Sequence, residues 1–232
     1  AGAQIARQVA DQYTTDEKPR WVLGSLGPGT KLPTLGHTTY ELLKQAYETA
    51  STGLIEGGSD ALLIETTQDL LQAKSAVNGA RDAITKSKKD IVLIAQVTVE
   101  TTGTMLMGSE IGAALNALEP LGIDLIGLNC ATGPAEMSEH LRVLSKGSTV
   151  GISVMPNAGL PVLGENGAHY PLSPAELAKS LKQFVIDYKV NLVGGCCGTT
   201  PEHMGEVVKQ LQGTKLATRE VVREIGASSL YQ

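Results

Sequence analysis

The sequence predicts an α/β protein with a (β/α)8 TIM-barrel architecture, of which about six of the eight strand–helix units lie in this chain. Short apolar segments alternate with helical patterns along the 232 residues. Glycine is abundant, at 26 residues, and aromatic residues make up 3%, which is typical of parallel strands joined by tight turns. Polar and reactive residues follow the ends of several strands, which is where a barrel builds its site.

Six apolar segments have the length and continuity of strands that are buried on both faces. A half-exposed strand would alternate polar and apolar residues, whereas most of these segments are uninterrupted. Trp21 in the first segment is expected in the core. The segments are 21–24, 61–64, 91–97, 124–128, 150–154 and 191–193.

The residues between these segments carry signals for the start of a helix. Thr38-Thr39-Tyr40-Glu41 and Ser173-Pro174-Ala175-Glu176 both have the pattern of a capping box. Gly133-Pro134 and Thr200-Pro201 place proline at the first helical position. Residues 1–13 form an amphipathic helical pattern rather than a signal peptide. Each apolar segment is therefore followed by a helix, which defines six strand–helix units.

A doubly wound sheet is the other architecture built from such units. Its dinucleotide fingerprint, G-x-G-x-x-G after the first strand, does not fit residues 24–29, which read GSLGPG. A barrel instead collects its functional residues on the loops after the strands. The residues found there are Glu65, Thr98, Glu100, Asn129 with Cys130, Asn157, and Cys196 with Cys197.

Composition excludes several classes of partner. The net charge is −5 and no long basic run is present, so neither nucleic acid nor an anionic membrane surface is expected to bind. No apolar stretch reaches the roughly 18 residues of a membrane span. Three cysteines, two of them adjacent, do not suit a disulfide framework. We expect a reduced, cytoplasmic protein whose cysteines pack in the core or bind metal, with a regulatory disulfide as a smaller alternative.

The cysteines have the arrangement of a catalytic zinc site. Glycines on both sides of Cys196-Cys197 allow the chain to turn so that both sulfurs face one point, and Cys130 at another strand end supplies a third. Zinc with three protein ligands keeps a fourth position open. Three thiolates around Zn²⁺ leave a net charge of about −1, which suits a further thiolate better than water. A thiol substrate that is alkylated on sulfur is therefore expected.

Four segments resemble motifs of the homocysteine S-methyltransferase family, and the resemblance covers residues 1–212. Residues 194–201, GGCCGTTP, resemble its double-cysteine motif, and residues 127–130, GLNC, its first zinc-ligand motif. Residues 60–66 and 24–28 are similar to two of its strands. The resemblance implies a (β/α)8 barrel that transfers a methyl group to homocysteine held through its sulfur on zinc.

The resemblance also implies roles for single residues. Cys130, Cys196 and Cys197 are the implied zinc ligands, and the same residues carry the catalysis. Glu65 matches the carboxylate that holds the amino group of homocysteine; the alternative is a cap for the next helix.

Two asparagines complete the implied site. Asn157 resembles the residue that can occupy zinc when homocysteine is absent, and the alternative is a turn residue before Gly159. Asn129, beside the first ligand, is placed with the substrate-binding residues.

The ends of the chain carry further expectations. Residues 220–232 resemble the linker of the cobalamin-dependent, methionine-forming members, which favours methylcobalamin, carried on another domain, over betaine or S-methylmethionine as donor. The Asp-Gly-Ala-Met-Gly type motif of the family's first strand is not found. We therefore expect residues 1–212 to be a homocysteine-binding barrel lacking its first two strands, and residues 213–232 to be a linker or edge helix. The missing barrel segment or other domains are expected as partners. The alternative to an enzyme is a non-catalytic zinc-binding or redox-sensing barrel fragment.

Overall fold

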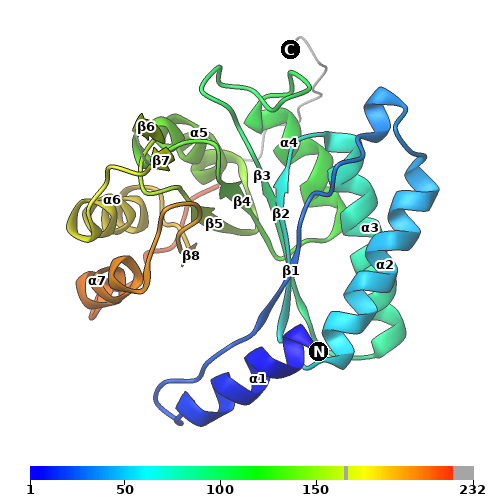
Figure 1. Ribbon diagram of the computed structural model, residues 1–232, viewed down its shortest axis with the longest axis horizontal. Helices are drawn as coiled ribbons and strands as arrows, with labels where there is room; N and C mark the ends of the chain where they lie inside the picture. The colour runs from blue at the N-terminus through cyan, green and yellow to red at the C-terminus, as the bar shows by residue number, and fades with distance from the viewer. Residues whose placement is uncertain (165–166, 222–232) are drawn as a thin grey trace.

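Six parallel strands form one curled sheet in the computed structural model, which describes residues 1–164 and 167–221 (Figure 1). They lie side by side in chain order, β1-β2-β3-β4-β5-β8, so each consecutive pair is joined by a crossover. This confirms the predicted barrel architecture of six strand–helix units. The bounds are β1 (Leu23–Leu26), β2 (Ala61–Thr67), β3 (Val92–Val97), β4 (Leu125–Asn129), β5 (Gly151–Met155) and β8 (Leu192–Val193).

The helices that follow the strands cover the outer face of the sheet (Figure 1). They are α2 (Tyr40–Glu56), α3 (Leu70–Ser87), α4 (Ile111–Leu118), α5 (Pro134–Gly147), α6 (Pro174–Asp187) and α7 (Pro201–Leu211), with two 3-10 turns, η1 (Pro33–Leu35) and η2 (Glu119–Leu121). Both predicted capping segments begin a helix, but only the one at Ser173 forms a capping box, because the N-cap of α2 is Thr39 rather than Thr38. Thr39 accepts a hydrogen bond from the amide of Leu42, and Ser173 and Glu176 bond reciprocally at the start of α6.

Both faces of the sheet are apolar, which explains the continuous apolar segments in the sequence. The outer face packs against the helices in the main core, where Leu62, Ile126 and Ile152 are completely buried. The inner face carries a smaller cluster that includes Leu63 and Ile94. Gln96 and Ser153 are buried polar residues within β3 and β5, where they bond to each other at 3.1 Å. The polar residues of the candidate site lie at the strand ends.

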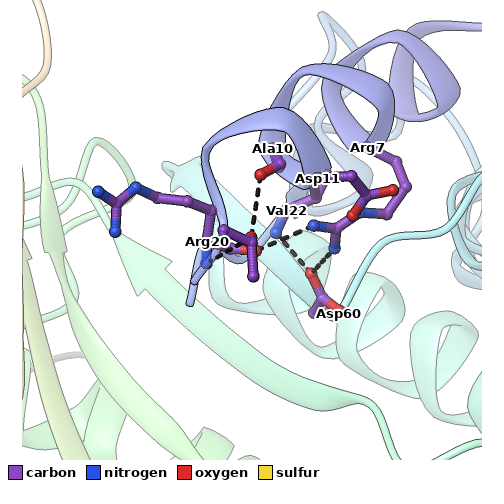
Figure 2. Close-up of polar contacts among 7 residues, drawn as sticks. Arg7, Ala10, Asp11, Arg20, Val22 and Asp60 are labelled. Atoms are coloured by element: carbon purple, nitrogen blue, oxygen red, sulfur yellow. Dashed lines mark hydrogen bonds and ion pairs between the residues drawn. The ribbon is translucent and has the colours of Figure 1, made fainter. Parts of the chain in front are cut away.

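The N-terminal helix α1 (Gly2–Tyr13) is fastened across the base of the sheet by Arg7 (Figure 2). Arg7 Nη1 lies 2.7 Å from Asp60 Oδ2, and Nη2 donates to the carbonyl of Arg20 at 3.0 Å. The same Asp60 oxygen accepts the amide of Val22 at 2.6 Å. One carboxylate therefore joins α1 to the starts of β1 and β2.

The expectation that Trp21 lies in the core is wrong, because its side chain is 67% exposed. The strand begins two residues later, at Leu23, and Val22 takes the buried position. The apolar side chains of α1 are also exposed, so its amphipathic face is not covered by the described residues. These exposed side chains are Ile5, Val9 and Tyr13.

One feature after β5 was not anticipated. A short exposed hairpin, β6 (Val162–Gly164) with β7 (Gly167–His169), lies beyond β5. Residues 214–221, the described part of the expected linker, form neither helix nor strand. Arg219 fastens this part by donating to the carbonyls of Ser148 at 3.0 Å and Val150. Residues 222–232 lie outside the described residues, so the linker assignment stays a prediction.

Within the described ranges, no helix is long and apolar enough to span a membrane.

Candidate metal centre

The sulfurs of Cys130, Cys196 and Cys197 converge at the carboxyl ends of β4 and β8, all within 4.8 Å of one another. The Cys130–Cys197 separation is 3.8 Å and the Cys196–Cys197 separation is 3.9 Å. Tetrahedral zinc with bonds of about 2.3 Å to sulfur requires neighbouring sulfurs about 3.8 Å apart. The two separations that include Cys197 match this spacing, so the cluster is compatible with three ligands of one tetrahedral ion. Cys197 is exposed and the other two are half-buried, so a fourth ligand can reach the site from solvent.

The two adjacent cysteines face one point because they lie on a turn beyond the end of β8. The carbonyl of Cys196 accepts both the amide of Thr199, at 3.2 Å, and its hydroxyl, at 2.7 Å. Gly198 has φ +78°, a conformation that glycine adopts freely. The amide of Cys196 donates to the carbonyl of Pro156 at 2.9 Å, which ties the turn to the loop after β5.

Cys130 reaches the cluster through an unusual backbone conformation. Cys130 and Ala131 have φ values of +61° and +57°, and Thr66 at the end of β2 has +60°. Such left-handed conformations cost non-glycine residues on the order of 1–3 kcal/mol each and gather at functional sites. The amide of Cys130 is held by the carbonyl of Met155 at 3.1 Å. The turn directs the Cys130 sulfur out of β4 and toward Cys197.

The proximity of the thiols separates their pKa values. The pKa of Cys130 falls to about 5, chiefly because its thiolate accepts a hydrogen bond from Cys196; burial opposes this, and the amide of Ala131 adds to it. The pKa of Cys196 is raised, first because its thiol donates to Cys130, then by burial and by the neighbouring negative charge. The cluster therefore holds a thiolate at neutral pH, which favours a cation.

Asn129 is completely buried beside the cluster and uses both ends of its amide. Its oxygen accepts the amide of Thr66 at 2.7 Å, and its nitrogen donates to the Thr66 hydroxyl at 2.7 Å. The same nitrogen lies 3.9 Å from the sulfur of Cys196. The structure therefore places Asn129 between the end of β2 and the cysteines.

Asn157 lies between two of the cysteines and is 3% exposed. Its side-chain oxygen accepts the amide of Cys197 at 3.1 Å, and its side chain is hydrogen-bonded to the sulfur of Cys130. Its backbone also forms the predicted turn, since its carbonyl accepts the amide of Gly159 at 2.7 Å. Asn157 is thus adjacent to the position that a metal would take.

Glu65 lies at the carboxyl end of β2, where its Oε1 accepts the hydroxyl of Ser25 at 2.5 Å. The alternative that Glu65 caps the following helix is wrong, because the N-cap of α3 is Asp69, which accepts the amide of Leu71 at 2.8 Å. The carboxylate of Glu65 is half-buried at the same end of the sheet as the cysteines.

Two residues outside the predicted site support this end of the sheet. His203 is buried, accepts the amide of Thr200 on Nδ1 at 3.2 Å, and pairs through Nε2 with the carbonyl of Leu172 at 3.0 Å. Tyr170 is hydrogen-bonded to Cys197. His203 is the third residue after Thr200 and completes a capping box at the start of α7, whereas no pattern in the sequence marks Tyr170.

A curled parallel sheet with three converging cysteines on the loops after its strands defines a barrel protein with a thiolate centre. The sequence profile of the homocysteine S-methyltransferase family matches residues 1–211, and the chain belongs to that family.

Two curated relatives are methionine synthases of mycobacteria. The chain is 60% identical over 230 residues to the methionine synthase of Mycobacterium tuberculosis (strain ATCC 25618 / H37Rv), covering 99% of this chain and 19% of that protein. It is 59% identical over 235 residues to that of Mycobacterium leprae (strain TN), covering 99% and 20%. The chain spans about a fifth of the length of these relatives.

Solved structures of the Escherichia coli homocysteine methyltransferase MmuM share the fold. The apo form superposes with a TM-score of 0.68 at 19% identity, over 89% of this chain and 70% of that chain. The metallated form superposes with a TM-score of 0.65 at 18% identity, over 89% and 67%. At this identity the likeness concerns the fold alone, and it agrees with the barrel class.

Proposed function

We propose that this chain is the homocysteine-binding part of a methionine synthase, and that it binds zinc and transfers a methyl group to the thiolate of homocysteine. The observation that carries the proposal is the spacing of the three sulfurs, 3.8 and 3.9 Å for the two pairs that include Cys197, which is that of three ligands around one tetrahedral ion. Membership of the family and 60% identity to a methionine synthase support it.

The three cysteines would hold the ion and leave its fourth position toward solvent. When bound, zinc lowers the pKa of a thiol that reaches that position. The charge of three thiolates keeps a substrate sulfur electron-rich, because the centre as a whole stays near −1. Asn157, which lies against Cys130 and Cys197, is the residue we propose as fourth ligand in the absence of substrate.

The remaining groups would orient the substrate. Glu65, whose carboxylate lies at the same end of the sheet, would accept the α-ammonium group of homocysteine. Asn129 would help to fix the position of Glu65, because it makes two hydrogen bonds to Thr66, the residue that follows Glu65. The sulfur then forms a bond to the donor's methyl carbon while the donor keeps the electron pair of the broken bond, and the thiol proton leaves to solvent.

The donor we propose is methylcobalamin, carried by another part of the whole protein. The chain spans about a fifth of the length of its methionine synthase relatives, which leaves room for donor-carrying domains. The partners are therefore homocysteine and the remaining parts of the full-length protein.

Zinc content and proton release test this proposal. The purified chain should hold one zinc, Cys196→Ser should lose it, and homocysteine should release one proton on binding, whereas homoserine, which has oxygen in place of sulfur, should not. Ser25→Ala is the matched control, because Ser25 contacts Glu65 and should leave zinc in place. A metal-free chain whose thiols react like ordinary surface cysteines would instead indicate a redox-sensing or otherwise non-catalytic barrel.

A further inference from the structure

The side chain of Tyr170 packs directly on the turn that carries Cys197. A Cβ added to Gly198 would lie 2.2 Å from Tyr170 Cγ and 2.4 Å from its Cβ and Cδ2. Gly198 follows Cys197, which is the exposed cysteine of the three. The phenol ring therefore covers the backbone of the metal turn, in space that only a glycine leaves open.

Hydrogen bonds connect the backbone near Tyr170 to the turn that carries Cys197. The amide of Leu172 donates to the carbonyl of Ala158, and the amide of Ala158 donates to the carbonyl of Cys197, both at 2.9 Å. His203 on α7 pairs with the carbonyl of Leu172 at 3.0 Å. The segment that carries Tyr170 is thus fastened to the loops on both sides of the cluster, so the position of the ring follows from the fold.

Neutral polar side chains from the end of β4, from the loop after β5 and from the residues after β7 lie beside the three sulfurs. The nitrogen of Asn129 lies 3.9 Å from the Cys196 sulfur, and Asn157 is bonded to Cys130. The hydroxyl of Tyr170 is hydrogen-bonded to Cys197, and its ring lies against Gly198, the next residue in the chain. Each sulfur therefore has a neutral polar side chain beside it.

We propose that Tyr170 is a positioning residue of the thiolate centre, whose ring fixes the Cys197–Gly198 turn and whose hydroxyl donates a hydrogen bond to the Cys197 sulfur. The proposal rests on the proposed zinc site. A neutral donor withdraws some electron density from a thiolate while leaving the net charge of the centre near −1. It also fixes the direction of the sulfur lone pairs, which sets the geometry around the open position.

Two substitutions separate the hydroxyl from the ring. Tyr170→Phe removes the donor and keeps the ring, and Tyr170→Ala removes both. The matched control is Tyr188→Phe, because the Tyr188 hydroxyl is 2.7 Å from Ser138 Oγ, between α5 and α6. Zinc affinity is measured by chelator competition, and the Co²⁺-substituted chain reports the thiolate-to-cobalt charge-transfer band. Alkylation of Cys197 in the metal-free chain, followed by peptide mapping, is a readout that needs no metal.

Tyr170→Phe should weaken zinc binding about 10-fold and shift the charge-transfer band. At a pH where the thiol is ionised, Cys197 should react faster with an alkylating agent, because a thiolate without its hydrogen-bond donor is more nucleophilic. Tyr170→Ala should do so more strongly, and Tyr188→Phe should match the wild type. If the wild type binds zinc and Tyr170→Phe equals it in all three measurements, the role of Tyr170 is overturned while the proposed function stands. If the wild type binds no zinc, the proposed function fails, and unchanged Cys197 alkylation in Tyr170→Phe would then refute the hydrogen bond as well.

Discussion

The amide nitrogen of Asn129 lies 3.9 Å from the sulfur of Cys196, while the same amide makes two 2.7 Å hydrogen bonds to Thr66. Thr66 follows Glu65 and has a left-handed backbone, at a point where the register between β2 and β3 is irregular. One buried amide therefore joins the proposed substrate clamp to the proposed metal ligands. A substitution of Asn129 should therefore affect both the proposed substrate-binding residue and the proposed metal ligands.

Asn129→Asp tests this link. Aspartate keeps an acceptor for the Thr66 amide, but it loses the N–H donors and places a carboxylate in a completely buried position beside the thiol of Cys196. The free energy of unfolding of the metal-free chain, measured by urea titration, should fall by about 2 kcal/mol. Asn78→Asp is the control, because Asn78 donates to the Tyr40 hydroxyl at a half-buried contact. Equal losses in the two variants would contradict the link.

Gly198→Ala should be costly because of Tyr170. Gly198 and Gly213 have nearly equal φ values, +78° and +76°, but a Cβ at Gly213 would meet nothing within 4 Å. Gly213→Ala therefore reports backbone strain alone, about 1 kcal/mol, and Gly198→Ala should cost about 1–3 kcal/mol more through overpacking. Adding Tyr170→Ala should recover most of that difference. A double variant whose losses simply add would show that the ring does not occupy this space.

The pH dependence of alkylation should differ between the cysteines of the metal-free chain. The pKa of Cys130 is about 5, below its ordinary value of 9.0, so Cys130 should react with iodoacetamide with a midpoint near pH 5. The pKa of Cys196 is raised, so it should stay unreactive at neutral pH. Peptide mapping after timed alkylation measures both. A Cys130 midpoint at about pH 8–9, the range of a free thiol, would contradict the hydrogen-bonded cluster.

The same shifts set the sign of the stability change with pH. Because the folded pKa of Cys130 is depressed, its contribution is present above the unfolded pKa of about 9 and is lost as pH falls toward 5. The folded pKa of Cys196 is raised, so its contribution is present below about pH 9 and is lost as pH rises further. The melting temperature of the metal-free chain should therefore fall both as the pH is lowered toward 5 and as it is raised above about 9. Cys130→Ser should remove the fall at low pH.

Glu65→Gln should weaken homocysteine binding and leave zinc in place. A charged hydrogen bond contributes about 1.5–3 kcal/mol, so the dissociation constant should rise roughly 10–100-fold, measured by calorimetry. Glu56→Gln, at the last residue of α2, is the control and should bind homocysteine normally. Loss of zinc from Glu65→Gln, or unchanged homocysteine binding, would show that Glu65 does not bind the ammonium group of the substrate.

Local patterns in the sequence were enough to predict the strands and helix starts. The segment 124–128 became β4 at Leu125–Asn129, and 150–154 became β5 at Gly151–Met155, each shifted by one residue. The capping box at Ser173 formed as predicted. These features depend on residues that are neighbours in the chain, so a window of a few residues contains their cause.

The sequence by itself determined the barrel class, its six strand–helix units and the gathering of three cysteines, because apolar periodicity and glycine-flanked strand ends are local properties. Only the tertiary structure decided that Trp21 is exposed, that Asn129 holds Thr66, and that Tyr170 covers Gly198. Asn129 and Thr66 are 63 residues apart in the chain, and Tyr170 and Gly198 also come from separate segments. Such contacts depend on how segments that are far apart in the chain pack against each other. The local sequence of one segment does not show which other segment it will contact.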